Sequence, residues 1–343
     1  MNHSEGVRPK YSVIVPVYNR VDEVEELLES LLFQVDVPPS VYEVIVVEDG
    51  STIPCGYLCE AYKWKGLNVK YLSKDNEGRS IARNYGIQQA QGDWLIFFDS
   101  DCIIPEDYFA KLEKNRHLED LDCFGGPDAA HSSFTPTQKA INLAMTSFLT
   151  TGGIRGGKKS MEKFTPRTFN MGIRRDTIDK VGGFREMYSE DIDMSTRIKN
   201  AGYKIGLLPD QYVYHKRRVD FKKFFKQVNV FGKSRITLHL LYPGSLKLVH
   251  LLPAFFLLGS IACIVLGCLI SPWWLLPLAL FSLALMLNAI ASTGSMKIAI
   301  LAIPASFIQL YGYGLGFLEA FYNKIVLRKG RDINEEIMAR KGK

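Results

Sequence analysis

Three long uncharged segments constrain what the C-terminal third of the chain can form. Residues 251–270 and 273–291 contain no charged side chain, and residues 298–318 contain Gln309 as their only strongly polar side chain. As helices, segments of this length can cross a bilayer core of ~30 Å. A buried helix hairpin of a soluble protein would share this composition. Three such segments in succession, flanked by Lys and Arg, instead predict membrane helices over 246–270, 273–291 and 298–322.

Positive charge lies on both sides of these segments. The formal charge is +6, with eight basic side chains and one acid in residues 215–235 and seven basic and three acidic ones in residues 323–343. Such local clustering disfavours a nucleic-acid-binding protein. Three crossings would separate the two basic segments, although basic residues prefer the cytoplasmic side. Either one segment is re-entrant, with the third and its Pro304 the best candidate, or the tail breaks the rule. Three simple spans are our first expectation.

The N-terminal residues contain no apolar stretch after their charges, so we expect no signal peptide. This predicts a multi-pass protein of the cytoplasmic (inner) membrane whose N-terminal domain lies in the cytoplasm. The six cysteines show no zinc-site spacing, which fits structural thiols in a reducing compartment.

The N-terminal part alternates between strand and helix patterns. Apolar runs that end in polar residues predict strands at 11–17, 42–51, 67–73 and 93–98, and helical spacing predicts helices at 21–34 and 79–91. This alternation is typical of an α/β domain with a mainly parallel sheet and helices on both faces. Ligands of such sheets bind beyond the carboxyl ends of the strands.

Several carboxylates follow these strand ends. Asp99 and Asp101 are one residue apart and repel each other unless a cation or solvent compensates. A solvated turn would satisfy them, but their position beside Glu48-Asp49 favours a divalent cation, Mg²⁺ or Mn²⁺, with a diphosphate. Glu190 and Asp191 open a predicted helix, where acids are stabilised by the helix dipole in any case. One of them could alternatively act as a general base on a hydroxyl.

The motifs together resemble family 2 glycosyltransferases, inverting enzymes with a GT-A fold, of the bacterial membrane-anchored type. The matching segments are PVYNR (16–20), VVEDGS (46–51), NEGRSIARNYGI (76–87), DSD (99–101), VGGFRE (181–186) and SEDIDMSTRIKNAGY (189–203). The resemblance implies a GT-A nucleotide-diphospho-sugar transferase fold over residues 1–215. It also implies a nucleotide-diphosphate sugar as donor and a divalent cation as cofactor.

The resemblance assigns roles at matching positions. Asp191 corresponds to the catalytic base, and Asp101 to a direct metal ligand. For the nucleotide, the resemblance implies a backbone platform at Pro16, Val17 and Tyr18, a contact of Asp49 with the base, and a basic residue at Arg83 or, alternatively, Arg79. It implies that Glu190 contacts the substrate and that Asp99 contacts both the substrate and the metal. His215 is implied as a further metal ligand. Glu48 stands where Asp is commoner in the family.

Residues 216–245 form a basic amphipathic segment before the first apolar run. One helical face carries Phe221, Phe224, Phe225, Val228 and Phe231, and lysines occupy the other side. Such a helix suits the headgroup region of an anionic leaflet, although a core helix would also show the aromatic stripe. We therefore predict an interfacial helix that contacts membrane lipids and orients the catalytic domain, followed by the transmembrane region 246–322 and the basic tail 323–343.

The sequence thus predicts a glycosyltransferase that moves a sugar to a hydroxyl of a lipid-linked or polysaccharide acceptor in cell-surface glycan synthesis. The Gln-x-x-Arg-Trp motif of processive relatives is absent, which favours addition of one sugar. A metal-dependent nucleotidyltransferase would share the crevice and the carboxylates, and a non-catalytic membrane scaffold would leave them unexplained. The sugar, the acceptor and the linkage remain open at this point.

Overall fold

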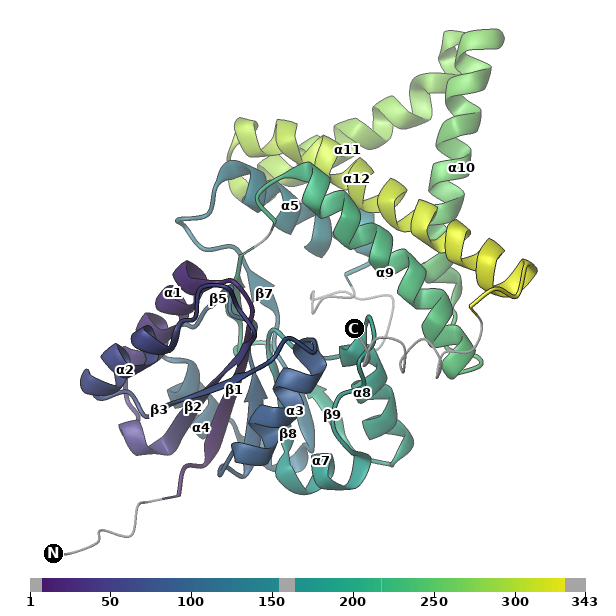
Figure 1. Ribbon diagram of the computed structural model, residues 1–343. Helices are drawn as coiled ribbons and strands as arrows, with labels where there is room; N and C mark the ends of the chain where they lie inside the picture. The colour runs from purple at the N-terminus through teal and green to yellow at the C-terminus, as the bar shows by residue number, and fades with distance from the viewer. Residues whose placement is uncertain (1–7, 154–163, 217, 331–343) are drawn as a thin grey trace, which may run out of the picture. The chain divides into compact units, whose positions relative to one another are not determined.

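The computed structural model describes residues 8–153, 164–216 and 218–330 (Figure 1). These residues form two compact units. The sheet unit consists of residues 8–129 and 164–215, and the helical unit of residues 130–153, 216 and 218–330. Residues 130–153, which precede the predicted boundary at residue 215, leave the sheet unit and pack within the helical unit.

The sheet unit contains a seven-stranded sheet with the order β3-β2-β1-β4-β8-β6-β9. Its strands are β1 (Tyr11–Val17), β2 (Tyr42–Asp49), β3 (Val69–Lys74), β4 (Trp94–Phe97), β6 (Cys123–Gly125), β8 (Met171–Arg174) and β9 (Ile205–Leu207). β1, β2, β3 and β4 are parallel neighbours, and β8 runs antiparallel to both β4 and β6. The expected mainly parallel sheet is confirmed.

Helices cover both faces of this sheet, as expected (Figure 1). Alternate residues of β1 enter different cores, because Val13 and Val15 pack in one cluster and Ile14 in the other. The first cluster includes side chains of α1 (Val21–Leu32), α2 (Gly56–Trp64) and α4 (Tyr108–Lys114). The second includes side chains of α3 (Arg79–Gln89), α7 (Arg175–Val181) and α8 (Glu190–Asn200).

A second, three-stranded sheet brings distant segments of the sheet unit together. Its order is β5-β10-β7, with β5 at Cys102–Ile103, β10 at Val213–His215 and β7 at Asp128–Ala129. His215 lies opposite Cys102 in the antiparallel pair. The residues just after β4 therefore meet the end of β10.

The helical unit consists of α5 (Pro136–Thr146), α6 (Phe148–Thr151), α9 (Phe221–Leu241), α10 (Leu248–Leu269), α11 (Leu276–Thr293) and α12 (Met296–Phe321). Three of its helical segments, Leu248–Leu269, Pro272–Thr293 and Met296–Val326, are long and apolar enough to cross a membrane. The last stays continuous through Pro304, the position that the alternative of a broken third segment rested on.

The aromatic face of α9 is covered by protein. Phe224 and Val228 are fully buried in a cluster with Ala140 of α5 and Ala302 of α12, and Phe221 packs against the same cluster. The sequence correctly marked this face as apolar, but we had expected it to face lipid. The lysines Lys222, Lys223 and Lys226 on the other side are exposed.

Candidate active site

The predicted site residues gather at the carboxyl edge of the parallel strands. Pro16 and Val17 end β1, Asp49 ends β2, and Asp99 follows β4. Since these strands are parallel neighbours, their ends meet at one edge of the sheet.

Asp49 organises the loop that precedes α3. One carboxylate oxygen accepts hydrogen bonds from Lys74 Nζ at 2.8 Å and from the Glu77 amide at 3.1 Å, and the other accepts from the Gly78 amide at 2.9 Å. The neighbouring Glu48 is buried and accepts from the Cys55 amide at 2.8 Å. Glu48 therefore stabilises the loop that follows β2, and this contact accommodates Glu where Asp is commoner in the family.

A cavity of about 360 Å³ opens beside this loop. Pro16, Val17, Tyr18 and Asp49 line it, together with Arg79. Tyr18 is half exposed, so its ring is available to a planar ligand. The residues assigned to the nucleotide by resemblance thus share one cavity wall, with the exception of Arg83.

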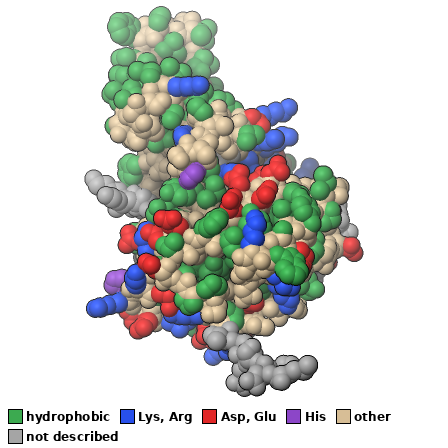
Figure 2. Space-filling model, turned by 90° about the vertical axis from the view of Figure 1, so that its left-hand side faces the viewer, with side chains coloured by type: hydrophobic (Ala, Val, Ile, Leu, Met, Phe, Trp, Pro, Cys, Tyr) green, Lys and Arg blue, Asp and Glu red, His purple; other side chains and the backbone are tan. Residues whose placement is uncertain are grey.

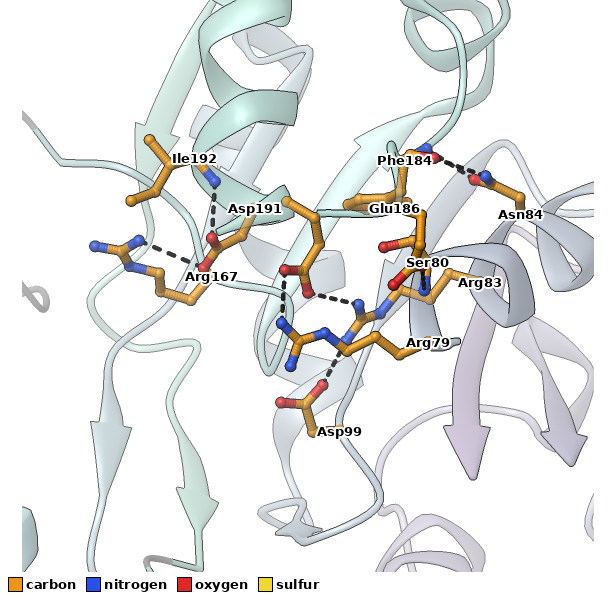
Figure 3. A network of polar contacts seen from close by, with 11 residues as sticks. Arg79, Ser80, Arg83, Asn84, Asp99, Arg167, Phe184, Glu186, Asp191 and Ile192 are labelled. Carbon is orange, nitrogen blue, oxygen red and sulfur yellow. Dashed lines mark hydrogen bonds and ion pairs between the residues drawn. The ribbon is translucent and has the colours of Figure 1, made fainter. Parts of the chain in front are cut away.

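Arg83 is a buried bridge between two motifs (Figure 3). It is 1% exposed and donates to Asp99 Oδ1 at 2.8 Å and to Glu190 Oε1 at 2.9 Å. Arg79, one helical turn earlier, binds Glu190 Oε2 at 2.8 Å and keeps 52% of its side chain exposed. The charge of Glu190 raises the pKa of the Arg79 guanidinium. In this structure Arg79, rather than Arg83, faces the cavity.

Asp191 lies beside this bridge, in the first turn of α8. Its Oδ1 accepts from the Ile192 amide at 2.8 Å, and its Oδ2 lies 3.4 Å from Arg167 Nη1 (Figure 3). The preceding Ser189 has a φ of 62°, a left-handed conformation that is unfavourable for a residue with a side chain. Backbone strain at this position is consistent with a functional constraint on the direction of Glu190 and Asp191.

Asp101 and His215 form the best candidate metal site among the described residues. His215 Nε2 is 3.1 Å from Asp101 Oδ1, and Asp128 Oδ2 is 3.9 Å from the other ring nitrogen. A carboxylate oxygen and an imidazole nitrogen suit Mn²⁺ well and are compatible with Mg²⁺. Asp99, the other predicted ligand, instead turns to Arg83.

Cys102 lies beside these two residues but fits a hard cation poorly. Its ligand atom is within 4.8 Å of those of Asp101 and His215. Burial, and then the nearby acids, raise the pKa of its thiol well above the usual range. The thiol contacts the Phe169 carbonyl at 3.6 Å, and sulfur is a poor ligand for Mg²⁺ or Mn²⁺. The donor set left for a cation is Asp101 with His215.

Glu186 is a site residue that sequence reasoning missed. It lines the cavity, and its Oε2 accepts from the Ser80 amide at 3.2 Å, at the N-terminus of α3. Burial raises the pKa of its carboxyl group, against the lowering effects of the Ser80 hydrogen bond and of Arg79. The VGGFRE motif contained Glu186, but no pattern in it indicated that the acid would face the strand ends.

Comparisons with known proteins agree with this geometry. The model of the family described as Glycosyl transferase family 2 matches residues 12–182. Glycosyltransferase AglE of Haloferax volcanii is 28% identical over 255 residues, which cover 73% of this chain and 81% of that protein. The uncharacterized glycosyltransferase EpsJ of Bacillus subtilis is 32% identical over 142 residues, or 40% of each chain.

Among solved structures, the fold is similar to that of a mannosyltransferase from Pyrobaculum calidifontis, PcManGT, in complex with GDP-Man and Mn²⁺. The TM-score is 0.57 at 18% identity, and the match covers 92% of this chain and 88% of that one. The likeness shows that the two chains share the GT-A fold.

Proposed function

Because the chain belongs to glycosyl transferase family 2, we propose that it transfers a sugar from a nucleoside-diphosphate donor to a hydroxyl of a lipid-linked or glycan acceptor, with inversion. The observation that carries this proposal is the Arg83 bridge. It joins Asp99, two residues from the metal candidate Asp101, to Glu190, the neighbour of the candidate base. The cation and the base would therefore act around one sugar.

Asp191 is the proposed general base. Its carboxylate takes the proton of the acceptor hydroxyl while the hydroxyl oxygen forms a bond to the anomeric carbon. The bond from that carbon to the diphosphate breaks in the same step, and the nucleoside diphosphate leaves from the opposite face. Arg167 Nη1, 3.4 Å from Asp191 Oδ2, would help to hold the carboxylate in place.

Asp101 and His215 are the proposed holders of Mg²⁺ or Mn²⁺. When bound, the cation would neutralise charge on the diphosphate. Pro16, Val17, Tyr18 and Asp49 would contact the nucleotide in the cavity. The contacts among Glu190, Arg83 and Asp99 would hold α8 against the end of β4, and Arg79 would lie nearer the ligand. The GDP-Man and Mn²⁺ of the similar mannosyltransferase support this type of donor and cofactor.

The three apolar helices support a membrane-bound enzyme with a lipid-linked acceptor. We propose the cytoplasmic membrane as its location, with the catalytic unit on the cytoplasmic side. A nucleotidyltransferase could use a similar cavity and similar carboxylates, but the family match favours sugar transfer.

Donor binding tests the proposed function directly. Purified full-length protein is heated with a panel of nucleotide sugars, with and without Mn²⁺. We expect one donor to raise the unfolding temperature only in the presence of the cation. Asp101→Asn should lose this stabilisation. The control Asp107→Asn, which changes an exposed carboxylate just before α4, should keep it. Cation-dependent stabilisation that survives in Asp101→Asn would reject the metal assignment, and no response to any donor would count against the function.

A further inference from the structure

α9 and α12 run parallel to each other within the helical unit, so that successive residues of one helix contact successive residues of the other. Two polar contacts join them, Asn229 to the Gly312 carbonyl at 3.2 Å and Lys233 to Glu319 at 2.7 Å. A third joins Thr237 to Lys324, in the turn that directly follows α12, at 3.0 Å. The sequence separations of these pairs are 83, 86 and 87, so both helices advance together. The C-terminal half of α12 therefore follows α9 along most of its length.

Glycines hold the two backbones in direct contact. A Cβ atom at Gly232 of α9 would lie 2.1 Å from the Tyr313 carbonyl oxygen, and one at Gly316 of α12 would lie 2.0 Å from the Asn229 carbonyl oxygen. Larger residues cannot occupy either position without separating the helices. Whatever depth in a bilayer α9 takes, this half of α12 must share it.

α9 cannot lie at the depth of the hydrocarbon core. It carries five permanent cations along its length: Lys222, Lys223, Lys226, Lys233 and Arg235. Cations are costly at the centre of a bilayer and are attracted to anionic headgroups. Lys226 and Lys233 lie within the stretch that is paired with α12, so a crossing α12 would carry them into the core.

The other two long helices are built differently. Residues 251–296 contain no charged side chain, and none of residues 261–284 is buried by protein. α10 and α11 are joined by a turn (Figure 1) in which Trp273 and Trp274 are exposed. In the view of Figure 2, the outer part of this helix pair shows hydrophobic and uncharged side chains. Protein buries 50% of the most apolar window of α12, against 17% and 11% for α10 and α11.

From these contacts we infer that only α10 and α11 cross the bilayer, as a hairpin, and that α12 lies with α9 at the level of the headgroups. The 22 residues of α10 are long enough to span a core of ~30 Å. Two crossings return the chain to the side of α9. The basic tail and the basic α9 then face the same anionic leaflet, which removes the charge conflict of a three-span topology.

Labelling from one side of the membrane separates the two topologies. Cys263 and Cys268 are replaced by Ser, because the other four cysteines are buried. Single cysteines at the exposed Lys222 and Lys329 are then treated with a membrane-impermeant maleimide in sealed vesicles of one orientation, before and after permeabilisation. We expect Lys222→Cys and Lys329→Cys to be labelled to the same extent in intact vesicles, a ratio near one. Labelling of only one of them would mean an odd number of crossings and would overturn the inference.

A depth measurement tests the position of α12 itself. Leu315 of α12 and Leu283 of α11 are matched, with 45% and 46% of their surfaces exposed. Each is replaced by a cysteine that carries a fluorophore, and quenching by lipids brominated at known depths is compared. We expect Leu283→Cys to report a position near the midplane, ~15 Å inside the core boundary, and Leu315→Cys one within ~5–10 Å of that boundary. Equal depths for the two positions, whether deep or shallow, would refute the proposed arrangement.

Discussion

Arg83 should be far more important for stability than its neighbour Arg79, although both bind Glu190. The perturbation is Arg83→Met, which keeps the unbranched apolar part of the side chain and removes the charged guanidinium group. Asp99 and Glu190 then lose a partner at 2.8 and 2.9 Å, and Glu190 is almost fully buried. Arg79 would remain as the only cation on that carboxylate among the contacts described here.

The expected loss follows from burial. Removing one partner of a buried ion pair typically costs about 3–5 kcal/mol, because the other charge stays desolvated. For a unit of this size, each 1 kcal/mol lowers the unfolding temperature by roughly 2–4 °C, so Arg83→Met should lower it by roughly 6–20 °C. Arg79→Met removes a contact made by a side chain that is 52% exposed, and ion pairs with an exposed partner contribute about 0–1 kcal/mol.

The assay is the apparent unfolding temperature of the full-length protein in detergent, at one heating rate. A double variant, Arg83→Met with Glu190→Gln, removes the uncompensated charge and should recover much of the loss. Equal destabilisation by Arg83→Met and Arg79→Met would contradict this expectation, and so would a double variant that is no more stable than Arg83→Met alone. Either result would mean that the guanidinium does not compensate a desolvated Glu190.

Three further changes test other parts of the site and its attachment. Asp191→Asn should lower transfer by about two to four orders of magnitude while donor binding is kept, since only proton removal is lost; weaker donor binding to the same degree would contradict this role. Because the pKa of Glu186 is raised in the fold, its charge becomes destabilising as the pH rises through that pKa. Glu186→Gln should therefore unfold at a higher temperature than the wild type at pH 8, with a smaller difference at pH 4; the opposite trend would contradict the burial argument. Changing Lys222, Lys223 and Lys226 to Glu should leave the protein in the membrane fraction and reduce transfer to a lipid-linked acceptor, while donor hydrolysis persists; equal loss of both activities would place these lysines in the catalytic fold.

Much of the sheet unit could be predicted because its signals are local. The apolar parts of the segments 11–17 and 42–49 form buried strands, and the polar ends of these parallel strands lie at the same edge of the sheet. The choice between Arg79 and Arg83 could not be made in this way. They are four residues apart and share a face of α3, so only the packing of α8 against that helix decides which one is buried.

The helical unit shows the same limit. Sequence periodicity revealed the apolar face of α9, but a face of this kind fits lipid and protein equally well. Phe224 meets α5 and α12 because residues 130–153 cross over from the middle of the sheet unit, and no local pattern reveals such a crossing. His215 was a weak candidate for a similar reason, since its partner Asp101 is brought close only by the small sheet.

The docking of α5 has a practical consequence for producing the catalytic part as a soluble fragment. A chain ended at residue 215 would discard α9, α11 and α12 but keep α5. The buried face of α5, formed by Ala140, Ile141, Ala144 and Met145, would then be stripped of its cover. Because this apolar face would be exposed to water, copies of such a fragment would associate through it and precipitate. A soluble fragment therefore needs two cuts, one at the C-terminal end of β10 and one that replaces residues 130–163 with a short polar connection.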